Sequence, residues 1–189
     1  LFSLQNALKE IGYNADIVSE SNLIKKYDSI FLPGVGSFPE SIKTLKEKKM
    51  ENEIKNFIKT GKAFVGICLG FQMLFSKSFE FRESSGLDII KGKVYSLENK
   101  LSIVPNVGWL KVTFVKNNNF IDEESLYAYF VHSYYAKLDD PNITNSSVKL
   151  ENFEFCSSIL LENILGTQFH PEKSGIEGLK MLKKFLHKF

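Results

Sequence analysis

The chain has 189 residues, of which 43% are apolar, 13% aromatic and 24% charged. These proportions are typical of a globular protein and argue against a collagenous, low-complexity or disordered chain. The 24 Lys and Arg residues nearly balance the 22 Asp and Glu residues, and the charges are mixed along the chain, so the sequence indicates no nucleic-acid partner. A chain of this length fits one domain, which we assign to residues 1–189.

The chain contains two cysteines, Cys68 and Cys156, and three histidines. These residues are too few for a disulfide framework or a cysteine-based zinc site, so we expect no metal, no cofactor and a reducing, cytoplasmic compartment. The longest nearly apolar run, Ala63 to Phe75, is shorter than the about 20 residues of a membrane-spanning helix. We therefore expect no membrane segment.

The first half of the chain alternates helix and strand patterns. In chain order we expect a helix over Leu1–Ile11, strands over Asp16–Val18 and Ser29–Leu32, a long or broken helix from Ser37 to Gly61, a strand over Ala63–Ile67 and a helix over Leu69–Phe75. Ser37 is the predicted N-cap, because proline follows it in the first helical turn. The wholly apolar run Ala63–Ile67 is typical of a strand buried on both faces of a parallel sheet.

Short strand patterns dominate the second half. We expect strands over Gly92–Leu97, Lys111–Val115, Leu126–Val131, Phe153–Leu161 and Ile164–Phe169. The chain ends in an amphipathic helix whose predicted sheet-facing residues are Ile176, Leu179, Leu182, Phe185 and Leu186. The two halves together predict an α/β fold with a β-rich second half.

The sequence Gly66-Ile67-Cys68-Leu69-Gly70 has the form of a nucleophile elbow with a thiol in place of a hydroxyl. The two glycines permit a crowded turn from strand to helix, and the turn presents the sulfur at a helix N-terminus, which favours the reactive thiolate. Taken alone, the pentapeptide fits equally well a buried structural cysteine between two packing glycines.

A thiol nucleophile needs a base, and the base needs a group that orients it. His170-Pro171-Glu172 supplies both, because side chains at i and i+2 of an extended segment share a face. His132 is a weaker rival for the base, and His187 in the lysine-rich tail is expected to be solvated. Cys156 lies in an alternating strand and is expected to be a core residue.

The segment from Leu32 to Ser37 is a glycine-rich loop between a predicted strand and a predicted helix. Its backbone amides, with that of Leu69, are candidates for stabilising an oxyanion. A plain turn or a phosphate-binding loop is an equally good interpretation of this segment by itself, although it lacks the P-loop lysine and the GxGxxG pattern.

Four segments in this order resemble the class I (triad) glutamine amidotransferases: PGVGSF, GICLGFQ, HSYY and GTQFHPEKSG. Within that family the sequence is most similar to the glutaminase subunits of imidazole glycerol phosphate synthases, and the resemblance covers essentially the whole chain. It implies a three-layer αβα, flavodoxin-like fold with a central, mostly parallel sheet. It also implies hydrolysis of L-glutamine and delivery of ammonia to a synthase or cyclase subunit.

The resemblance implies a role for each motif residue. Cys68 becomes the nucleophile that forms a γ-glutamyl thioester, His170 the base that later protonates ammonia, and Glu172 the acid that orients His170. The other implied site residues are Val35 and Leu69 at the oxyanion, and Gly34, Gly36, Gln72, Ser133 and Tyr134 at the substrate. The Val35 peptide is expected to need reorientation by a ligand on the partner, so activity without the partner should be low.

Two features depart from the family. The usual Pro-His-Met-Gly-Trp-Asn near the cyclase interface is Pro105-Asn106-Val107-Gly108-Trp109-Leu110 here, which keeps Trp109 as the expected partner contact. The changes at Asn106 and Leu110 leave open a paralogue that supplies another synthase, such as one amidating a nucleotide-sugar precursor. The first strand of the family is also absent before Leu1, which we interpret as an incomplete N-terminus.

Two further functions stay open at this point. One is a free-standing cysteine hydrolase built on the same elbow, which would show full turnover alone. The other is a catalytically silent regulatory subunit, although the intact Cys68, His170 and Glu172 argue against it.

Overall fold

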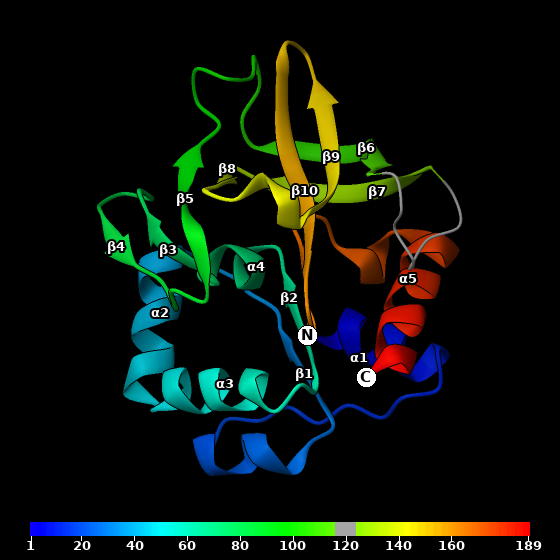
Figure 1. Ribbon diagram of the computed structural model, residues 1–189. Coiled ribbons are helices and arrows are strands. Elements are labelled where there is room, and N and C mark those ends of the chain that lie inside the picture. The colour runs from blue at the N-terminus through cyan, green and yellow to red at the C-terminus, as the bar shows by residue number, and fades with distance from the viewer. Residues whose placement is uncertain (116–123) are drawn as a thin grey trace.

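The computed structural model describes residues 1–115 and 124–189, and two β-sheets form its framework (Figure 1). The larger sheet has the strand order β1-β2-β11-β10-β9-β6-β7. Its strands are β1 (Ser29–Leu32), β2 (Ala63–Ile67), β6 (Asn106–Phe114), β7 (Ser125–His132), β9 (Thr144–Leu150), β10 (Phe153–Leu161) and β11 (Ile164–Thr167). Strands β1, β2 and β11 pair in parallel, and the remaining neighbours pair antiparallel. The sheet is therefore mixed and not mostly parallel as predicted, because the short turns that join β9 to β10 and β10 to β11 reverse the chain and pair these strands antiparallel.

The smaller sheet has the order β4-β3-β5-β8. Its strands are β3 (Phe75–Ser78), β4 (Ser84–Ser85), β5 (Ile90–Ser96) and β8 (Tyr134–Leu138). Strand β8 begins two residues after β7 ends, so the chain passes from the larger sheet to the smaller one at Ser133. That passage becomes one wall of the site described below.

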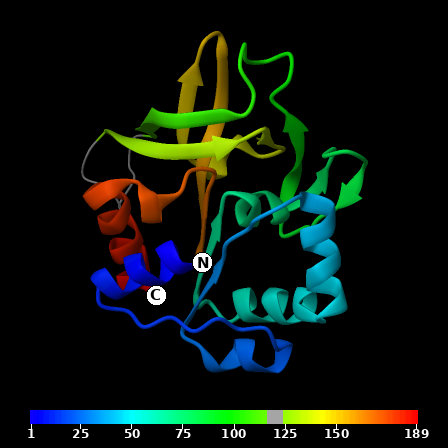
Figure 2. The ribbon, with the colours of Figure 1, turned by 180° about the vertical axis from the view of Figure 1, so that it is seen from behind.

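Helices cover both faces of the parallel strands (Figures 1 and 2). They are α1 (Phe2–Glu10), α2 (Phe38–Glu47), α3 (Met50–Lys59), α4 (Leu69–Met73) and α5 (Gly175–Lys188), with short 3₁₀ helices η1 (Ser21–Lys26), η2 (Pro141–Ile143) and η3 (Pro171–Lys173). In β2, Val65 and Ile67 pack with residues of α1 and α5, whereas Phe64 packs with residues of α2 and α3. The period of two in a strand thus produces the predicted layers.

Several predicted elements end elsewhere in the structure. The helix predicted from Leu69 to Phe75 stops at Met73, because Phe75 starts β3. The long helix breaks after Lys48, where Lys49 takes a left-handed conformation with φ 53° and starts α3. In the last helix, Ile176 is 70% exposed and does not face the sheet, which corrects the prediction for that residue.

The predicted strand Asp16–Val18 is wrong. Within the part of the chain that the structure describes, these residues pair with no strand, and Ile17 is exposed. An extended segment becomes a strand only where a neighbour accepts its hydrogen bonds, and the sequence pattern carries no information on that neighbour. Strands β3, β4, β8 and β9 were not predicted, and β6 begins at Asn106, before the predicted start at Lys111.

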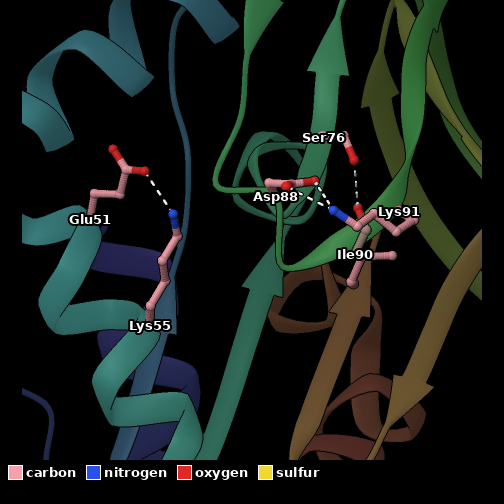
Figure 3. A network of polar contacts seen from close by, with 6 residues as sticks. All are labelled: Glu51, Lys55, Ser76, Asp88, Ile90 and Lys91. Carbon is pink, nitrogen blue, oxygen red and sulfur yellow. Dashed lines mark hydrogen bonds and ion pairs between the residues drawn. The ribbon is translucent and has the colours of Figure 1, made fainter.

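Ion pairs lie in α3 and next to β5 (Figure 3). Lys55 lies 2.8 Å from Glu51 within α3, and Lys91 lies 2.8 Å from Asp88 in the turn that leads into β5. In the same turn, the Ser76 hydroxyl donates to the Ile90 carbonyl at 3.5 Å, which ties β3 to β5. The Lys91–Asp88 pair is largely solvent-accessible and adds little to stability, whereas the Lys55–Glu51 pair is partly buried.

Among residues 1–115 and 124–189, no helix combines the length and the apolar character that crossing a membrane requires.

Candidate active site

Cys68 lies at the sharp turn between β2 and α4. Its backbone has φ 54° and ψ −109°, a conformation that residues with a side chain rarely adopt. The Cys68 N–H donates to the Thr167 carbonyl at 2.7 Å, so the end of β11 holds the turn in place. The sulfur therefore sits at the carboxyl end of two parallel strands and at the start of a helix, the position that the elbow motif predicts.

The glycines around the elbow are required by close packing. A Cβ atom at Gly70 would overlap the Leu32 carbonyl, and one at Gly66 would lie 3.1 Å from the Gly70 carbonyl. A Cβ atom at Gly34 would overlap the side chain of Leu69. The loop after β1 thus lies directly against the first turn of α4, as an oxyanion site shared by the two segments requires.

His170 follows β11 and forms an ion pair with Glu172. Its Nδ1 lies 2.8 Å from Glu172 Oε1, and the Glu172 side chain is only 8% exposed. The His170 N–H donates to the Tyr129 carbonyl at 2.9 Å, and the Ser174 hydroxyl donates to the His170 carbonyl at 2.6 Å. Strand β7 and the turn of η3 thereby fix the imidazole from two sides.

The electrostatics of this pair favour a charged imidazole. Burial lowers the pKa of His170, but the hydrogen bonds to Cys68 and Glu172 and the charges of both residues outweigh burial and raise that pKa from 6.5 to about 9. At neutral pH His170 is therefore protonated beside the sulfur. An imidazolium in this position stabilises a thiolate, which is the nucleophilic form of cysteine.

A cavity of about 220 Å³ opens at the elbow. It is lined by Gly36, Cys68, Leu69, Gln72, Glu80, Pro105, Val131, His132, Ser133 and Tyr134. The fold therefore brings together, from distant parts of the chain, six of the residues named from the motifs. Among residues 1–115 and 124–189, no three His, Cys, Asp or Glu side chains gather as a metal site.

The other predicted residues lie around this cavity. Gly34 packs behind Leu69, and the side chain of Val35 is 84% exposed. His170 and Glu172 stand behind the sulfur, outside the cavity wall. Trp109 lies on the outer face of β6, with 54% of its surface exposed.

His132 is buried beside the cavity, and both of its ring nitrogens are engaged. Its Nδ1 lies 2.8 Å from the Tyr134 carbonyl, and its Nε2 lies 2.9 Å from the Asn106 amide nitrogen. Burial lowers the pKa of His132 from 6.5 to about 4, so the ring is neutral at pH 7. These contacts favour His170 over His132 as the base.

Two residues of the site escaped the sequence analysis. Glu80 lines the cavity, and its Oε2 accepts the N–H of Phe38 at 2.8 Å. This carboxylate replaces the predicted Ser37 cap, since within the described residues the Ser37 side chain makes no capping hydrogen bond. The Glu80 pKa is raised by burial, and the Phe38 hydrogen bond lowers it in part. No local pattern points to Glu80, because its partner lies 42 residues away.

Gln168 is the second missed residue, although it stands inside the motif GTQFHPEKSG. It is fully buried and lies between Cys68 and Gln72. The motif was a usable signal, but the sequence does not tell which of its residues point toward the sulfur.

The outer face of β6 and β7 is apolar and aromatic. Val107 pairs with Val131, and Trp109 pairs with Tyr129, whose ring centre is 6.1 Å from that of Trp109. Two of the three departures from the family pattern lie on the inner face: Asn106 is buried and Leu110 packs against the core. The third, Val107 in place of methionine, is 57% exposed and changes one apolar side chain of the outer face for another.

Comparisons with known proteins identify the family of the chain. The family "Glutamine amidotransferase class-I" matches residues 2–189. Three relatives bear the name "Imidazole glycerol phosphate synthase subunit HisH". The protein of Caldanaerobacter subterraneus subsp. tengcongensis is 44% identical, with 98% of this chain and 91% of that protein covered. The protein of Pyrococcus furiosus is 43% identical, with 98% and 92% covered, and that of Sulfurimonas denitrificans is 40% identical, with 98% and 91% covered.

Solved structures support the fold. A structure described as "Crystal structure of glutamine amidotransferase" superposes with a TM-score of 0.77 at 18% identity, covering 98% of this chain and 92% of the other. "Structure of PurLQS from Thermotoga maritima" superposes with a TM-score of 0.78 at 20% identity, covering 99% and 92%. These matches confirm the predicted α/β fold, and the relatives confirm the resemblance that the four motifs predict.

Proposed function

Because the chain belongs to the class I glutamine amidotransferase family, we propose that it hydrolyses L-glutamine to glutamate and ammonia through a Cys68–His170–Glu172 triad. The observation that carries this proposal is the cavity at Cys68, with the His170–Glu172 pair behind the sulfur. The relatives named above are subunits of imidazole glycerol phosphate synthase, so the ammonia acceptor is the cyclase subunit of that enzyme, in histidine biosynthesis.

In the first half of the reaction, the Cys68 thiolate attacks the carboxamide carbon of glutamine. A C–S bond forms, the C–N bond breaks, and the His170 imidazolium gives its proton to the departing nitrogen, which leaves as ammonia. The products are a γ-glutamyl thioester and a neutral His170. No cofactor is needed for this step.

In the second half, water attacks the thioester while His170 accepts one of its protons. The C–S bond breaks, glutamate leaves, and the thiolate and imidazolium are restored. Glu172 keeps its carboxylate on Nδ1 throughout, which leaves the other ring nitrogen to exchange the proton. Its role is to orient and charge the ring, because it does not touch the reacting atoms. Since the nucleophile must remain a free thiol, we place the reaction in a reducing compartment, the cytoplasm.

The negative oxygen of the intermediate needs donors. Leu69 opens α4, and the first N–H groups of a helix have no acceptor within the helix. The peptide at Val35, next to the cavity-lining Gly36, supplies the second donor in our proposal once the loop turns it inward. Such a turn provides the control point for a partner subunit.

Recognition of glutamine requires a partner for each end of the molecule. We assign its α-ammonium group to Glu80, the one carboxylate among the cavity-lining residues. Gln72, Ser133 and Tyr134 offer polar side-chain or main-chain groups from the same wall. The electrostatic attraction between a carboxylate and an ammonium group is stronger when the carboxylate is buried than when it is exposed.

The apolar face of β6 and β7 is the docking surface that we assign to the cyclase subunit. Trp109 is its central aromatic residue, and exposed tryptophans of this kind are common anchors of protein interfaces. Asn106 and Leu110 point inward, so these two departures from the family pattern leave the docking surface unchanged, whereas the exposed Val107 replaces the family's methionine by another apolar side chain.

The proposal is tested by measuring glutamate release from L-glutamine by the chain alone and with the cyclase subunit and its nucleotide ligand. We expect slow turnover alone and strong stimulation by the loaded partner. Full turnover that no partner changes would identify a free-standing cysteine hydrolase. Stimulation by a different synthase only would overturn the assigned acceptor but leave the glutaminase reaction standing.

A further inference from the structure

Gln168 connects the proposed nucleophile to the cavity wall. It follows β11, is fully buried, and its own N–H donates to the Ser157 carbonyl at 2.8 Å. Its side-chain Oε1 lies 2.9 Å from Gln72 Nε2, and its Nε2 lies 3.8 Å from Cys68 Sγ. A buried amide held at both ends in this way has a single orientation available.

One carbonyl determines the direction of every hydrogen bond in this group. The Tyr134 carbonyl can only accept, so the Gln72 atom that lies 2.9 Å from it must be the nitrogen. The second N–H of that nitrogen then points to Gln168, whose oxygen must face it. The nitrogen of the Gln168 amide is therefore the end that faces the sulfur.

The anchoring carbonyl is itself held. His132 Nδ1 donates to it at 2.8 Å, and Asn106 occupies the other ring nitrogen of His132 at 2.9 Å. The neutral ring keeps this arrangement at pH 7, since the pKa of His132 is lowered to about 4 by burial. Asn106, one of the departures from the family pattern, thus belongs to the support of the site.

We propose that Gln168 is a positioning residue of the nucleophile: its amide N–H donates to the Cys68 thiolate, and its oxygen holds Gln72 so that Gln72 Oε1 is the atom offered to the ligand. Hydrogen bonds to a charged acceptor are stronger than those to a neutral one, so this contact favours the thiolate over the thiol. The inference rests on the proposed role of Cys68.

The effect of the Gln168 amide on the sulfur can be separated from the effects of the titratable groups around it. His170 faces the sulfur from the turn after β11, and the cavity wall adds Glu80 and the neutral His132. Of these, His170 supplies a full positive charge, whereas Gln168 supplies a fixed dipole that no pH change removes. Loss of Gln168 should therefore shift the pH dependence of thiolate reactivity without abolishing it.

The test measures alkylation of Cys68 by iodoacetamide across a pH series in the full chain, with the labelled cysteine identified by peptide mass spectrometry. Gln168→Leu removes both polar atoms at similar size, and Gln168→Glu keeps the oxygen but replaces the donor. Gln5→Leu is the matched control, because the Gln5 side chain donates to the Ala15 carbonyl and Gln5 is not among the residues that line the cavity.

We expect both Gln168 variants to react about threefold more slowly than the control at neutral pH, with the alkylation profile moved about half a pH unit upward. The shift should be larger for Gln168→Glu, which adds a negative charge beside the sulfur. A purely structural role would change the stability of the protein and leave the midpoint of the profile where it was.

Two results overturn the inference: a Gln168→Leu variant that folds like the control and keeps the wild-type pH profile, or failure of both Gln168 variants to show a cooperative unfolding transition. The second result would make Gln168 a residue of the fold alone. If iodoacetamide leaves Cys68 of the wild-type chain unlabelled, the proposed nucleophile itself is wrong, which is a different failure and is read from the same experiment.

Discussion

At the scale of single residues, Cys68 differs from Cys156 in surroundings more than in burial. Cys68 occupies a left-handed turn at a helix start and faces a protonated imidazole. Cys156 lies in β10, where burial raises the pKa of its thiol to about 12 and its sulfur lies 3.2 Å from the Ser158 carbonyl. Burial therefore favours the protonated thiol at Cys156, whereas the Cys68 sulfur lies beside the protonated His170 imidazole.

This contrast predicts the behaviour of substitutions at the nucleophile. Cys68→Ala and Cys68→Ser should lower glutaminase turnover by about a thousandfold or more, because no other group forms the thioester. Partner binding should be unchanged, since the side chain is small and Cys68 is only 9% exposed. A glutamine-analogue electrophile should label Cys68, and labelling of Cys156 with Cys68 untouched would contradict the assignment.

The proposed base, His170, and its proposed orienting acid, Glu172, should differ in their effect on turnover. His170→Ala removes the group that carries the proton and should cost about a thousandfold. Glu172→Gln leaves the ring in place but weakens its charge, and we expect a smaller loss of about tenfold to a hundredfold. Both should act on kcat more than on KM. Comparable, high activity in both variants would move the base to His132.

At the scale of elements, β7 joins the proposed docking surface to the base. The Tyr129 ring contacts Trp109 on the outer face, and the Tyr129 main chain bonds His170 and Ser174 on the other side. Lys173, in η3, lies 5.9 Å from the centre of the same ring. A partner that binds to this face therefore contacts β7, the strand whose main chain positions His170.

We therefore expect Trp109→Ala to weaken assembly with the cyclase subunit by about thirtyfold, or about 2 kcal/mol, and to reduce stimulation of the glutaminase. The unfolding midpoint should barely change, because the side chain is 54% exposed. Ile17→Ala is the control: Ile17 is also exposed, and Figures 1 and 2 place its segment at the end of the molecule away from β6 and β7. Equal binding by both variants would remove this face from the interface.

At the scale of the whole molecule, the buried His132 and the half-buried His170 give stability opposite dependences on pH. His132 has a folded pKa of about 4, below its ordinary 6.5, so the unfolded chain takes up a proton first and stability falls as pH drops from about 6.5 to about 4. His170 has a folded pKa of about 9, so its contribution is complete below about 6.5 and is lost as pH rises through about 9.

The free energy of unfolding should accordingly be largest near neutral pH and fall by up to about 3 kcal/mol on each side. The raised pKa of Glu80 opposes part of the acid loss, because its carboxyl is stabilised in the folded state when protonated. Urea unfolding at a series of pH values measures both limbs. His132→Gln should flatten the acid limb and His170→Gln the alkaline limb.

Local chemistry made much of the site predictable from the sequence. The run Ala63–Ile67 forms β2 with the predicted bounds, because an unbroken apolar segment between turn residues suits few other environments. The elbow is predicted by the glycines around Cys68, and the ion pair by the spacing of His170 and Glu172. Each of these two features depends only on residues within five positions of each other. Segments whose structure is decided by near neighbours were predicted well.

The remaining features were decided by contacts between distant segments. Asp16–Val18 has the composition of a strand but lacks a pairing strand among the described residues, and Glu80 joins the cavity through the N–H of a residue 42 positions earlier. Gln168 and Gln72 meet across 96 positions. The inward direction of Asn106 follows from the pairing of β6 with β7. The sequence by itself therefore determined the chemical groups and their local geometry. Only the tertiary structure decided which groups meet, because strand pairing and burial depend on neighbours that no short pattern encodes.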